Sequence, residues 1–209
     1  MATASAPGPT PTTRDSAPPF RLRDGRAVWF GPVTPAARDV IVRALARLSP
    51  ESSRRRFFTV RYQLSDRELD ALTILDGLNR YAVGATVRGD DGVVEGVGVA
   101  RYVRTTADPQ VAEVAFLVVD AFQGQGVGKA LLARLAEAAV ERGIRRFEGI
   151  VLPDNTPVLG LLTRHAPGTV THRDYDFLRV DVGLEGFAPA SRQAGGPFSS
   201  TTFPSGSRM

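Results

Sequence analysis

The sequence contains no cysteine among its 209 residues. Disulfide bonds, zinc sites with thiolate ligands and a cysteine nucleophile are therefore excluded for this chain. A membrane-spanning helix needs about 18 consecutive apolar residues, and no apolar run in the sequence is nearly that long. The amino-terminal segment also lacks the apolar centre of a signal peptide. We therefore expect a soluble, cytoplasmic protein that holds no metal and does not enter a membrane.

Lysine is nearly absent, because Lys129 is the only lysine in the sequence and the other basic residues are arginine. A formal net charge of +4 would suit a nucleic-acid partner. However, the arginines are scattered and alternate with acidic residues, as in 21–26 and 65–70, and no aromatic and basic RNA-binding motif is present. We expect a mixed, solvated surface and no nucleic-acid partner.

The two ends of the chain are poor in apolar side chains. Residues 1–19 and 185–209 consist largely of Pro, Ala, Ser, Thr and Gly, and cannot bury enough apolar surface to offset their chain entropy. We predict that both segments are disordered tails. Between them we find no linker and no repeat, and 43% of the whole chain is hydrophobic. One domain is therefore predicted over residues 20–184.

The periodicity of apolar residues predicts an α/β domain. Helical patterns begin at Thr34 and at Ser49, each with proline at the first helical position. A capping box, Ser65 with Glu68, begins a third helix. Further strands are expected at 26–30, 80–88, 93–104, 110–119 and 145–152, with a closing strand or hairpin at 169–184. Further helices are expected at 128–144 and 155–165. This order predicts a mixed, mostly antiparallel sheet flanked by helices.

A glycine-rich loop joins a predicted strand to a predicted helix in residues 118–132, VVDAFQGQGVGKALL. A Walker A loop needs a glycine where Gln123 stands and a hydroxyl residue where Ala130 stands. A Rossmann fingerprint needs a third glycine, but its two possible registers place Lys129 or Leu131 there. Neither nucleotide-binding loop fits this spacing.

The loop still has the physical features of an anion site. Gly124, Gly126 and Gly128 allow a ligand to approach the backbone closely. The helix begins near Val127, where free N–H groups and the positive end of the helix dipole face the loop, and Lys129 adds a charge. The alternative is a glycine-rich turn that only fits a tight corner.

The loop sequence QGQGVG at 123–128 matches the Q/R-x-x-G-x-G/A pattern of the GNAT N-acetyltransferase superfamily. In that family these amides hold the pyrophosphate of acetyl-CoA. AEVAFLVV is similar to the family's fourth strand, and VLPDNTPVLGLL resembles its fifth strand and the helix behind it. LSPESSRRRFF and LDALTILD further resemble the Pat-type bacterial protein lysine acetyltransferases. The resemblance implies a GNAT-like fold over nearly the whole predicted domain.

The resemblance also implies which residues contact acetyl-CoA, the expected co-substrate. In addition to the loop, backbone groups of the strand would pair with the pantetheine arm, and the Leu117 amide would polarise the thioester. Asn155 also fits a plain helix N-cap, and Arg164 an ordinary surface arginine. The residues assigned to the cofactor are Phe116, Leu117, Val118, Gln123, Gly124, Gln125, Gly126, Val127, Gly128, Lys129, Asn155 and Arg164.

Glu113 is the candidate general base. It lies in the predicted strand before the loop, on one face with Val111, Ala115 and Leu117, so we expect its carboxylate to be partly desolvated and suited to take a proton. The resemblance agrees, because the A-E-V/I-x-F pattern carries the base in histone-type and Pat-type members, acting directly or through water. The alternative is an exposed strand glutamate in a salt bridge.

The sequence departs from the family where a general acid is expected. Many members have a tyrosine near the CoA sulfur, in a segment like LYEKLGF, but this chain has Leu162 there. His165 and Tyr175 are weak substitutes. Either the thiolate leaves without a protein acid, or turnover is reduced.

Three functions remain open. The first is acetyl transfer to a primary amine, here a protein lysine; the second is acetyl transfer to a small-molecule amine; the third is a regulatory module that binds acyl-CoA without catalysis. The run 54–56, three arginines, suits either an acidic protein substrate or a solvated helix face. Pat-type enzymes can carry a cyclic-nucleotide or synthetase-like domain, for which we expect this chain to have no room. The sequence does not predict the oligomeric state.

Overall fold

A computed structural model of the protein describes residues 19–187, except for residues 62, 90, 167 and 186. The two predicted disordered tails, 1–19 and 185–209, lie outside the described residues apart from residues 19, 185 and 187. In chain order the elements are β1 (Phe20–Arg21), β2 (Ala27–Pro32), the 3-10 turn η1 (Pro35–Ala37), α1 (Arg38–Leu45), α2 (Pro50–Phe57), α3 (Asp66–Thr73), β3 (Arg80–Arg88), β4 (Val94–Arg104), β5 (Val111–Val118), the 3-10 turn η2 (Asp120–Phe122), α4 (Val127–Glu141), β6 (Arg146–Val151), α5 (Thr156–His165), β7 (Val170–Asp174) and β8 (Phe177–Gly183).

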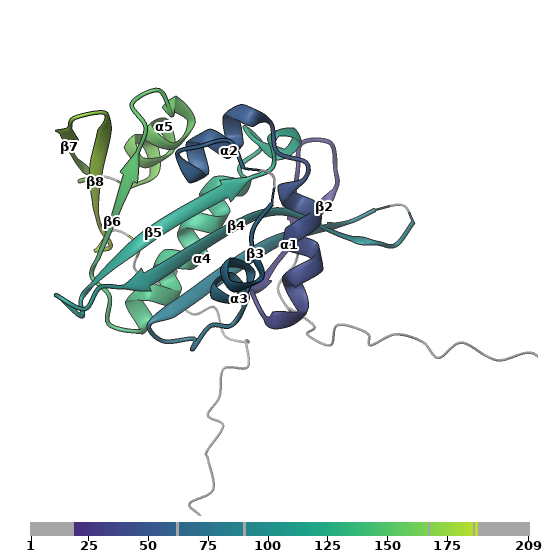
Figure 1. The fold of residues 1–209 in the computed structure, drawn as a ribbon, viewed down its shortest axis with the longest axis horizontal. Helices are drawn as coiled ribbons and strands as arrows, with labels where there is room; N and C mark the ends of the chain where they lie inside the picture. The colour runs from purple at the N-terminus through teal and green to yellow at the C-terminus, as the bar shows by residue number, and fades with distance from the viewer. Residues whose placement is uncertain (1–18, 62, 90, 167, 186, 188–209) are drawn as a thin grey trace, which may run out of the picture.

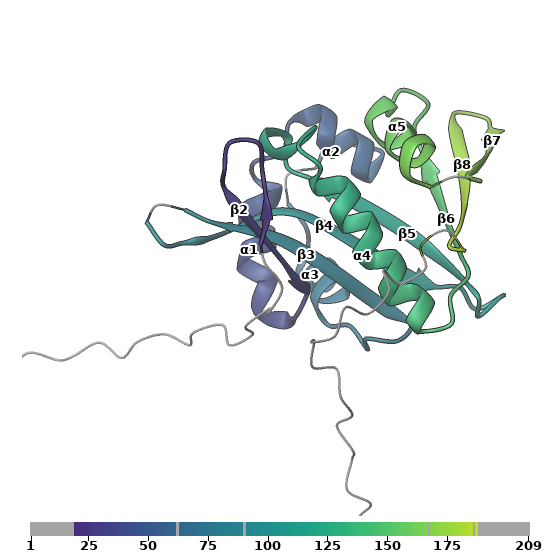
Figure 2. The same cartoon turned by 180° about the vertical axis from the view of Figure 1, so that it is seen from behind.

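The strands form one sheet of eight within the described residues, in the order β1-β2-β3-β4-β5-β6-β8-β7 (Figure 1). Every neighbouring pair is antiparallel except β5 and β6, which run parallel. The predicted α/β fold with a mixed, mostly antiparallel sheet is therefore confirmed. Helix α4 lies across one face of the sheet, and α1 and α3 lie on the other (Figure 2).

The helix ends follow from local sequence signals, with one exception. Ser49 caps α2 by accepting a hydrogen bond from the Ser52 amide, and Ser65 and Glu68 form the predicted capping box of α3. Thr34 makes no capping bond from its side chain. Its carbonyl instead accepts from the Ala37 amide, and this i to i+3 bond tightens the first turn into 3-10 geometry.

The core lies between α4 and the sheet. Helix α4 buries one apolar face, on which Leu131, Leu132 and Leu135 are almost fully excluded from solvent. Gly143, two residues after the end of this helix, has a left-handed φ of 82°, as is common just past a helix C-terminus. None of the helices within 19–187 that the structure describes is both long enough and apolar enough to cross a membrane.

The sheet forks between its two parallel strands. β5 and β6 are paired only at Val111–Glu113 with Arg146–Glu148, although β5 continues to Val118 and β6 to Val151. Beyond this short ladder, β6 stays paired with β8 along its whole length. The last part of β5 therefore has an open edge, which leads directly into the glycine loop.

Candidate active site

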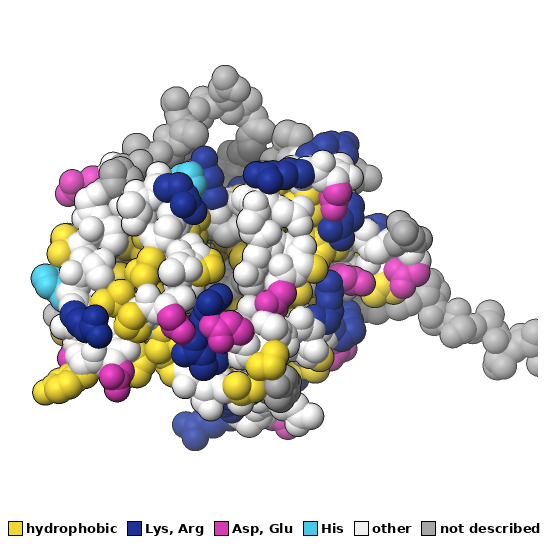
Figure 3. All heavy atoms as spheres, turned by 90° about the horizontal axis from the view of Figure 1, so that it is seen from above, with side chains coloured by type: hydrophobic (Ala, Val, Ile, Leu, Met, Phe, Trp, Pro, Cys, Tyr) yellow, Lys and Arg dark blue, Asp and Glu magenta, His cyan; other side chains and the backbone are white. Residues whose placement is uncertain are grey.

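A cavity of about 280 Å³ lies in this fork, and we call it the fork cavity. β5 contributes Glu113 and Phe116, β6 contributes Glu148, α2 contributes Arg56, and α5 contributes Leu162. Seen from above, the surface is hollowed near its centre, and Lys and Arg side chains stand beside the hollow (Figure 3). The fork thus brings together side chains from four elements that are distant in sequence.

The open edge of β5 exposes the backbone groups of only every second residue. The Val119 amide donates to the Val97 carbonyl of β4, so odd-numbered β5 residues point their backbone groups toward β4. Phe116 and Val118 consequently face the fork. The Leu117 N–H points toward β4, so the expected contact of this amide with the thioester does not fit the direction of the ladder.

The glycine loop presents a row of free amides. The backbone N–H groups of 124–129 have no backbone acceptor among the described residues, whereas the Ala130 amide already donates to the Gly126 carbonyl. Gly124 and Gly126 have φ of 69° and 90°, which turns successive amides to one side. A Cβ on Gly126 would also lie 3.1 Å from Phe20 Cζ. Two separate constraints therefore favour glycine at this position.

Gln123 has a structural part in the site. Its Nε2 donates to the Val118 carbonyl at 3.0 Å and to Ser52 Oγ at 3.1 Å. Its backbone amide donates to the Asp120 carbonyl. Of the predicted loop residues, Gln123 is thus already engaged in bonds that connect β5, the loop and α2.

Asp120 fixes the start of α2 on the loop. Its carboxylate accepts from the Ser49 amide and hydroxyl at 3.0 and 2.6 Å, and from the Ser52 hydroxyl at 2.8 Å. Burial acts to raise the pKa of Asp120, but these hydrogen bonds outweigh it and hold the pKa below its usual value. The carboxylate therefore stays ionised and anchors α2.

Basic groups gather where α5 meets the start of α4. His165 has a lowered pKa because of partial burial and then because Lys129 and Arg164 lie near it. The Arg164 guanidinium lies along α5, 3.2 Å from the position of a Cβ on Gly160. Lys129 and Arg164 are both exposed. The structure thus brings Lys129 and Arg164, the two predicted cationic contacts, near the same histidine.

Glu113 and Glu148 stand opposite each other in the last paired position before the fork opens. Both line the fork cavity. Glu113 is exposed, so the predicted partial desolvation is wrong for this side chain. It also forms no ion pair within the part of the chain that the structure describes, which disfavours the alternative of a salt-bridged strand residue.

Asn155 and Leu162 line the fork cavity from α5. Asn155 is buried and caps the helix by accepting from the Val158 amide. Leu162 is almost completely buried at the position where a tyrosine was expected, so it offers no proton. His165 does not line this cavity, and Tyr175 is 92% exposed at the tip of the β7–β8 hairpin. Neither takes the place of the missing acid.

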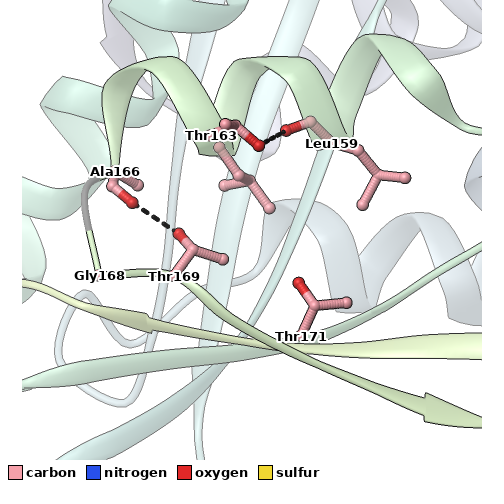
Figure 4. Close-up of a pocket in the computed structure, with 7 residues that line it drawn as sticks. Leu159, Thr163, Ala166, Gly168, Thr169 and Thr171 are labelled. Carbon is pink, nitrogen blue, oxygen red and sulfur yellow. Dashed lines mark hydrogen bonds between the residues drawn. The ribbon is translucent and has the colours of Figure 1, made fainter.

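Leu162 also borders a second cavity, of about 220 Å³, between α5 and β7 (Figure 4). The hydroxyls of Thr163 and Thr169 in its wall donate to the carbonyls of Leu159 and Ala166. These hydroxyls are occupied by their own helix or turn. These two hydroxyls are therefore not free to donate to a ligand in the second cavity.

Sequence reasoning missed several residues of the site. Glu148 lines the cavity, while Asp120 and Ser52 connect its two sides. Asp120 lies directly before the glycine loop, which was the available signal. No local pattern, however, relates it to a serine 68 residues away.

Comparison with known proteins agrees with this fold. The sequence model described as "Acetyltransferase (GNAT) family" matches residues 48–166. Acetyltransferase Pat of Mycolicibacterium smegmatis is 32% identical over 146 residues, which are 70% of this chain and 43% of that protein. Acetyltransferase PA5475 of Pseudomonas aeruginosa is 30% identical over 155 residues, 74% of this chain and 81% of that protein.

A solved structure is similar over most of the described chain. The GNAT domain of S. lividans PAT has a TM-score of 0.70 and 33% sequence identity, covering 79% of this chain and 95% of that one. The present chain spans less than half of the M. smegmatis relative. The family match, the two relatives and the forked sheet lead to one conclusion: the chain belongs to the GNAT acetyltransferase family and is a GNAT-type N-acetyltransferase.

Proposed function

We propose that this enzyme transfers an acetyl group from acetyl-CoA to a protein lysine, with Glu113 as general base. The observation that carries the proposal is the fork itself. It places the Glu113 carboxylate, an open strand edge and a row of free amides along one continuous path. A cytoplasmic location and the predicted domain limits, 20–184, remain part of the proposal.

The residues present fit the cofactor. The free amides of 124–129 at the start of α4 suit a pyrophosphate, since backbone N–H groups and the helix dipole both favour an anion. Lys129, in the first turn of α4, and Arg164, which like Lys129 lies near His165, add positive charge. The backbone groups of Phe116 and the Val118 amide face the open edge and suit the amide-bearing pantetheine arm, whereas the Val118 carbonyl already accepts from Gln123. Asn155 borders the fork cavity as well.

Acetyl-CoA supplies the acetyl group as a thioester. In the chain itself, Glu113 takes a proton from the acceptor ammonium, so that a free amine lone pair faces the fork. Glu148, in the neighbouring position on β6, adds a second negative charge that attracts the ammonium. Leu162 has no proton to donate, so the leaving thiolate takes up, through water, the second proton that the amine nitrogen loses as the amide forms.

A protein lysine is favoured over a small amine by the likeness to the Pat proteins. The third function, a module that binds acyl-CoA without turnover, is favoured by a different observation, namely that Leu162 stands where a general acid is expected. Both alternatives are tested together with the main proposal.

The test measures free thiol release and acetyl-lysine formation. The protein is incubated with acetyl-CoA and either a protein lysate or a panel of small amines, beside Glu113→Gln and, as a control, Glu137→Gln on α4. We expect Glu113→Gln to lower kcat by about 10²–10⁴ while CoA binding, followed by calorimetry, is unchanged. The control should keep the wild-type rate.

Each alternative has a distinct outcome. Full activity of Glu113→Gln would remove this residue from the mechanism. Turnover with small amines alone would replace protein lysine as the acceptor. CoA binding without thiol release in any sample would leave the non-catalytic module.

A further inference from the structure

Arg56 differs from its two arginine neighbours on α2. Arg54 pairs with Glu51 at 3.0 Å and also with Asp154, and the Arg55 Nε lies 2.9 Å from Glu51 Oε1. Arg56 has no ion pair or hydrogen bond among the residues that the structure describes, and its side chain is only partly exposed. Both Arg55 and Arg56 line the fork cavity, but of the two only Arg55 is paired with a carboxylate of the described residues.

Arg101 of β4 lies on the same face of the sheet as Glu113. Arg101 is paired in register with Ala115, two residues from Glu113 on β5, so their side chains point to the same side. The opposite side holds the fully buried Tyr102, next to Tyr81, on which Arg142 of α4 stacks at 4.5 Å. Arg101 therefore lies on the face away from α4.

The two arginines act on each other electrostatically. Burial, followed by the charge of Arg101, lowers the pKa of Arg56 to about 10. Burial also lowers the pKa of Arg101, as does Arg80, and Glu113 opposes this only in part. Holding two guanidinium groups near each other and partly out of water is unfavourable unless an anion joins them. No carboxylate of the described residues is bound to either group.

We propose that Arg56 and Arg101 form a subsite for a carboxylate beside the reacting amine. The preferred acceptor is then a lysine that has an acidic residue next to it in sequence. This inference rests on the proposed function, because it assumes that the amine approaches Glu113. The carboxylate could instead come from the acyl-CoA, if the acyl group is a dicarboxylic one whose far carboxylate is free. We favour the acceptor as the source of the carboxylate. Arg101 lies on the face of the sheet away from α4, whereas the free amides proposed to bind CoA lie at the start of α4.

The experiment compares two lysine peptides that differ only at the residues flanking the lysine, Asp in one and Asn in the other. For the wild-type protein with acetyl-CoA, we expect kcat/KM to favour the Asp peptide by about tenfold, as for one charge-assisted hydrogen bond. Arg56→Gln and Arg101→Gln should each bring the ratio close to one. Arg67→Gln, an exposed residue of α3 outside the cavity, should keep it.

Two further arms separate the sources of the carboxylate and the effects of misfolding. If the acyl group supplies it, the wild type will use succinyl-CoA in preference to acetyl-CoA with the Asn peptide, and Arg56→Gln will lose this preference. Arg56→Glu should reverse the peptide preference toward a version with Arg at the flanking positions. A reversed preference cannot arise from loss of folding.

Binding of the labelled peptides to the CoA-loaded protein, followed by fluorescence anisotropy, gives the same comparison without turnover. If no peptide releases thiol, the proposed function fails, but the anisotropy ratio still decides the subsite. Equal use and equal binding of the two peptides by the wild type, with no preference for succinyl-CoA, would overturn the inference. The inference would also be overturned if Arg56→Gln and Arg101→Gln both retained the wild-type preference for the Asp peptide.

Discussion

Gly126 carries a constraint that the loop motif only partly explains. Its φ of 90° is in the left-handed region, and Phe20 lies against the place where a side chain would begin. Gly128 differs, because it is inside α4 and a Cβ there meets only Leu161 at 3.6 Å and Val118 at 3.8 Å. Two glycines of one motif therefore have different physical roles.

Substitution should separate these roles. Gly126→Ala is expected to cost about 1–2 kcal/mol of unfolding free energy from the left-handed backbone, and about 2–4 °C in Tm for each kcal/mol in a chain of this size. Gly128→Ala should leave Tm unchanged or raise it, because alanine favours the helix. Calorimetry measures both. Equal losses would show that the conformation at Gly126 does not limit stability.

At the scale of elements, α2 connects the two halves of the site. Its first turn is held to the loop through Asp120, and its last turn places Arg56 in the fork cavity. Phe58, just after the helix, meets Phe177 of β8 edge-on, with ring centroids 5.3 Å apart. A displacement of the glycine loop is therefore expected to move Arg56 in the fork cavity, because α2 connects the two.

Asp120→Asn should weaken this connection. The loss of a charged acceptor for Ser49 and Ser52 is expected to cost about 1 kcal/mol, since the carboxylate is partly exposed. The KM for acetyl-CoA and the KM for the acceptor should both rise. Asp66→Asn removes an exposed ion pair with Arg38 and is the matched control. Unchanged KM values with a lowered Tm would limit Asp120 to a structural role.

Glu68 predicts a specific acid sensitivity of α3. Hydrogen bonds from Arg61 and then from Ser65 lower the pKa of Glu68 from 4.5 to about 2. A lowered carboxyl pKa stabilises the folded state above pH 4.5, and this contribution is lost as the pH falls from 4.5 to about 2. Glu68→Gln, which keeps a capping side chain, should flatten the decline. Urea unfolding across this range is the measurement, and identical slopes would contradict the prediction.

For the whole molecule, the forked sheet leaves the edge of β5 beyond Glu113 without a strand partner among the described residues. A ligand that bridges β5 and the start of α4 therefore adds contacts that the folded chain lacks by itself. Binding and stability are linked, because a ligand that binds only the folded state raises the free energy of unfolding.

Acetyl-CoA at 100 times its Kd should stabilise the protein by about 2.7 kcal/mol. The same excess should protect the amides of Val114, Phe116 and Val118, which face the open edge, and those of the glycine loop from hydrogen exchange. Gly126→Val, assayed at the same concentration, should show a much smaller rise in Tm, whereas Glu113→Gln should show the full rise. A full rise in the loop variant would move the cofactor away from the glycine loop.

The sequence by itself determined the family, the order of the elements and the positions of Glu113 and the glycine loop. These depend on local spacing: alternation in β5, capping at Ser65, and glycines two residues apart. Such signals are contained within a few residues, so they are readable before the chain folds. The edge strand β1, only two residues long, gave no periodic pattern and was missed.

Tertiary structure decided what the spacing could not. The direction of the Leu117 amide depends on pairing with β4, and the exposure of Glu113 depends on where β5 and β6 separate. Arg54, Arg55 and Arg56 read as one charge run, yet Arg54 and Arg55 pair with Glu51, whereas Arg56 lines the fork cavity with no ion pair among the described residues. The physical reason is that ion pairing and solvent exclusion arise between segments up to about a hundred residues apart, which no local pattern records.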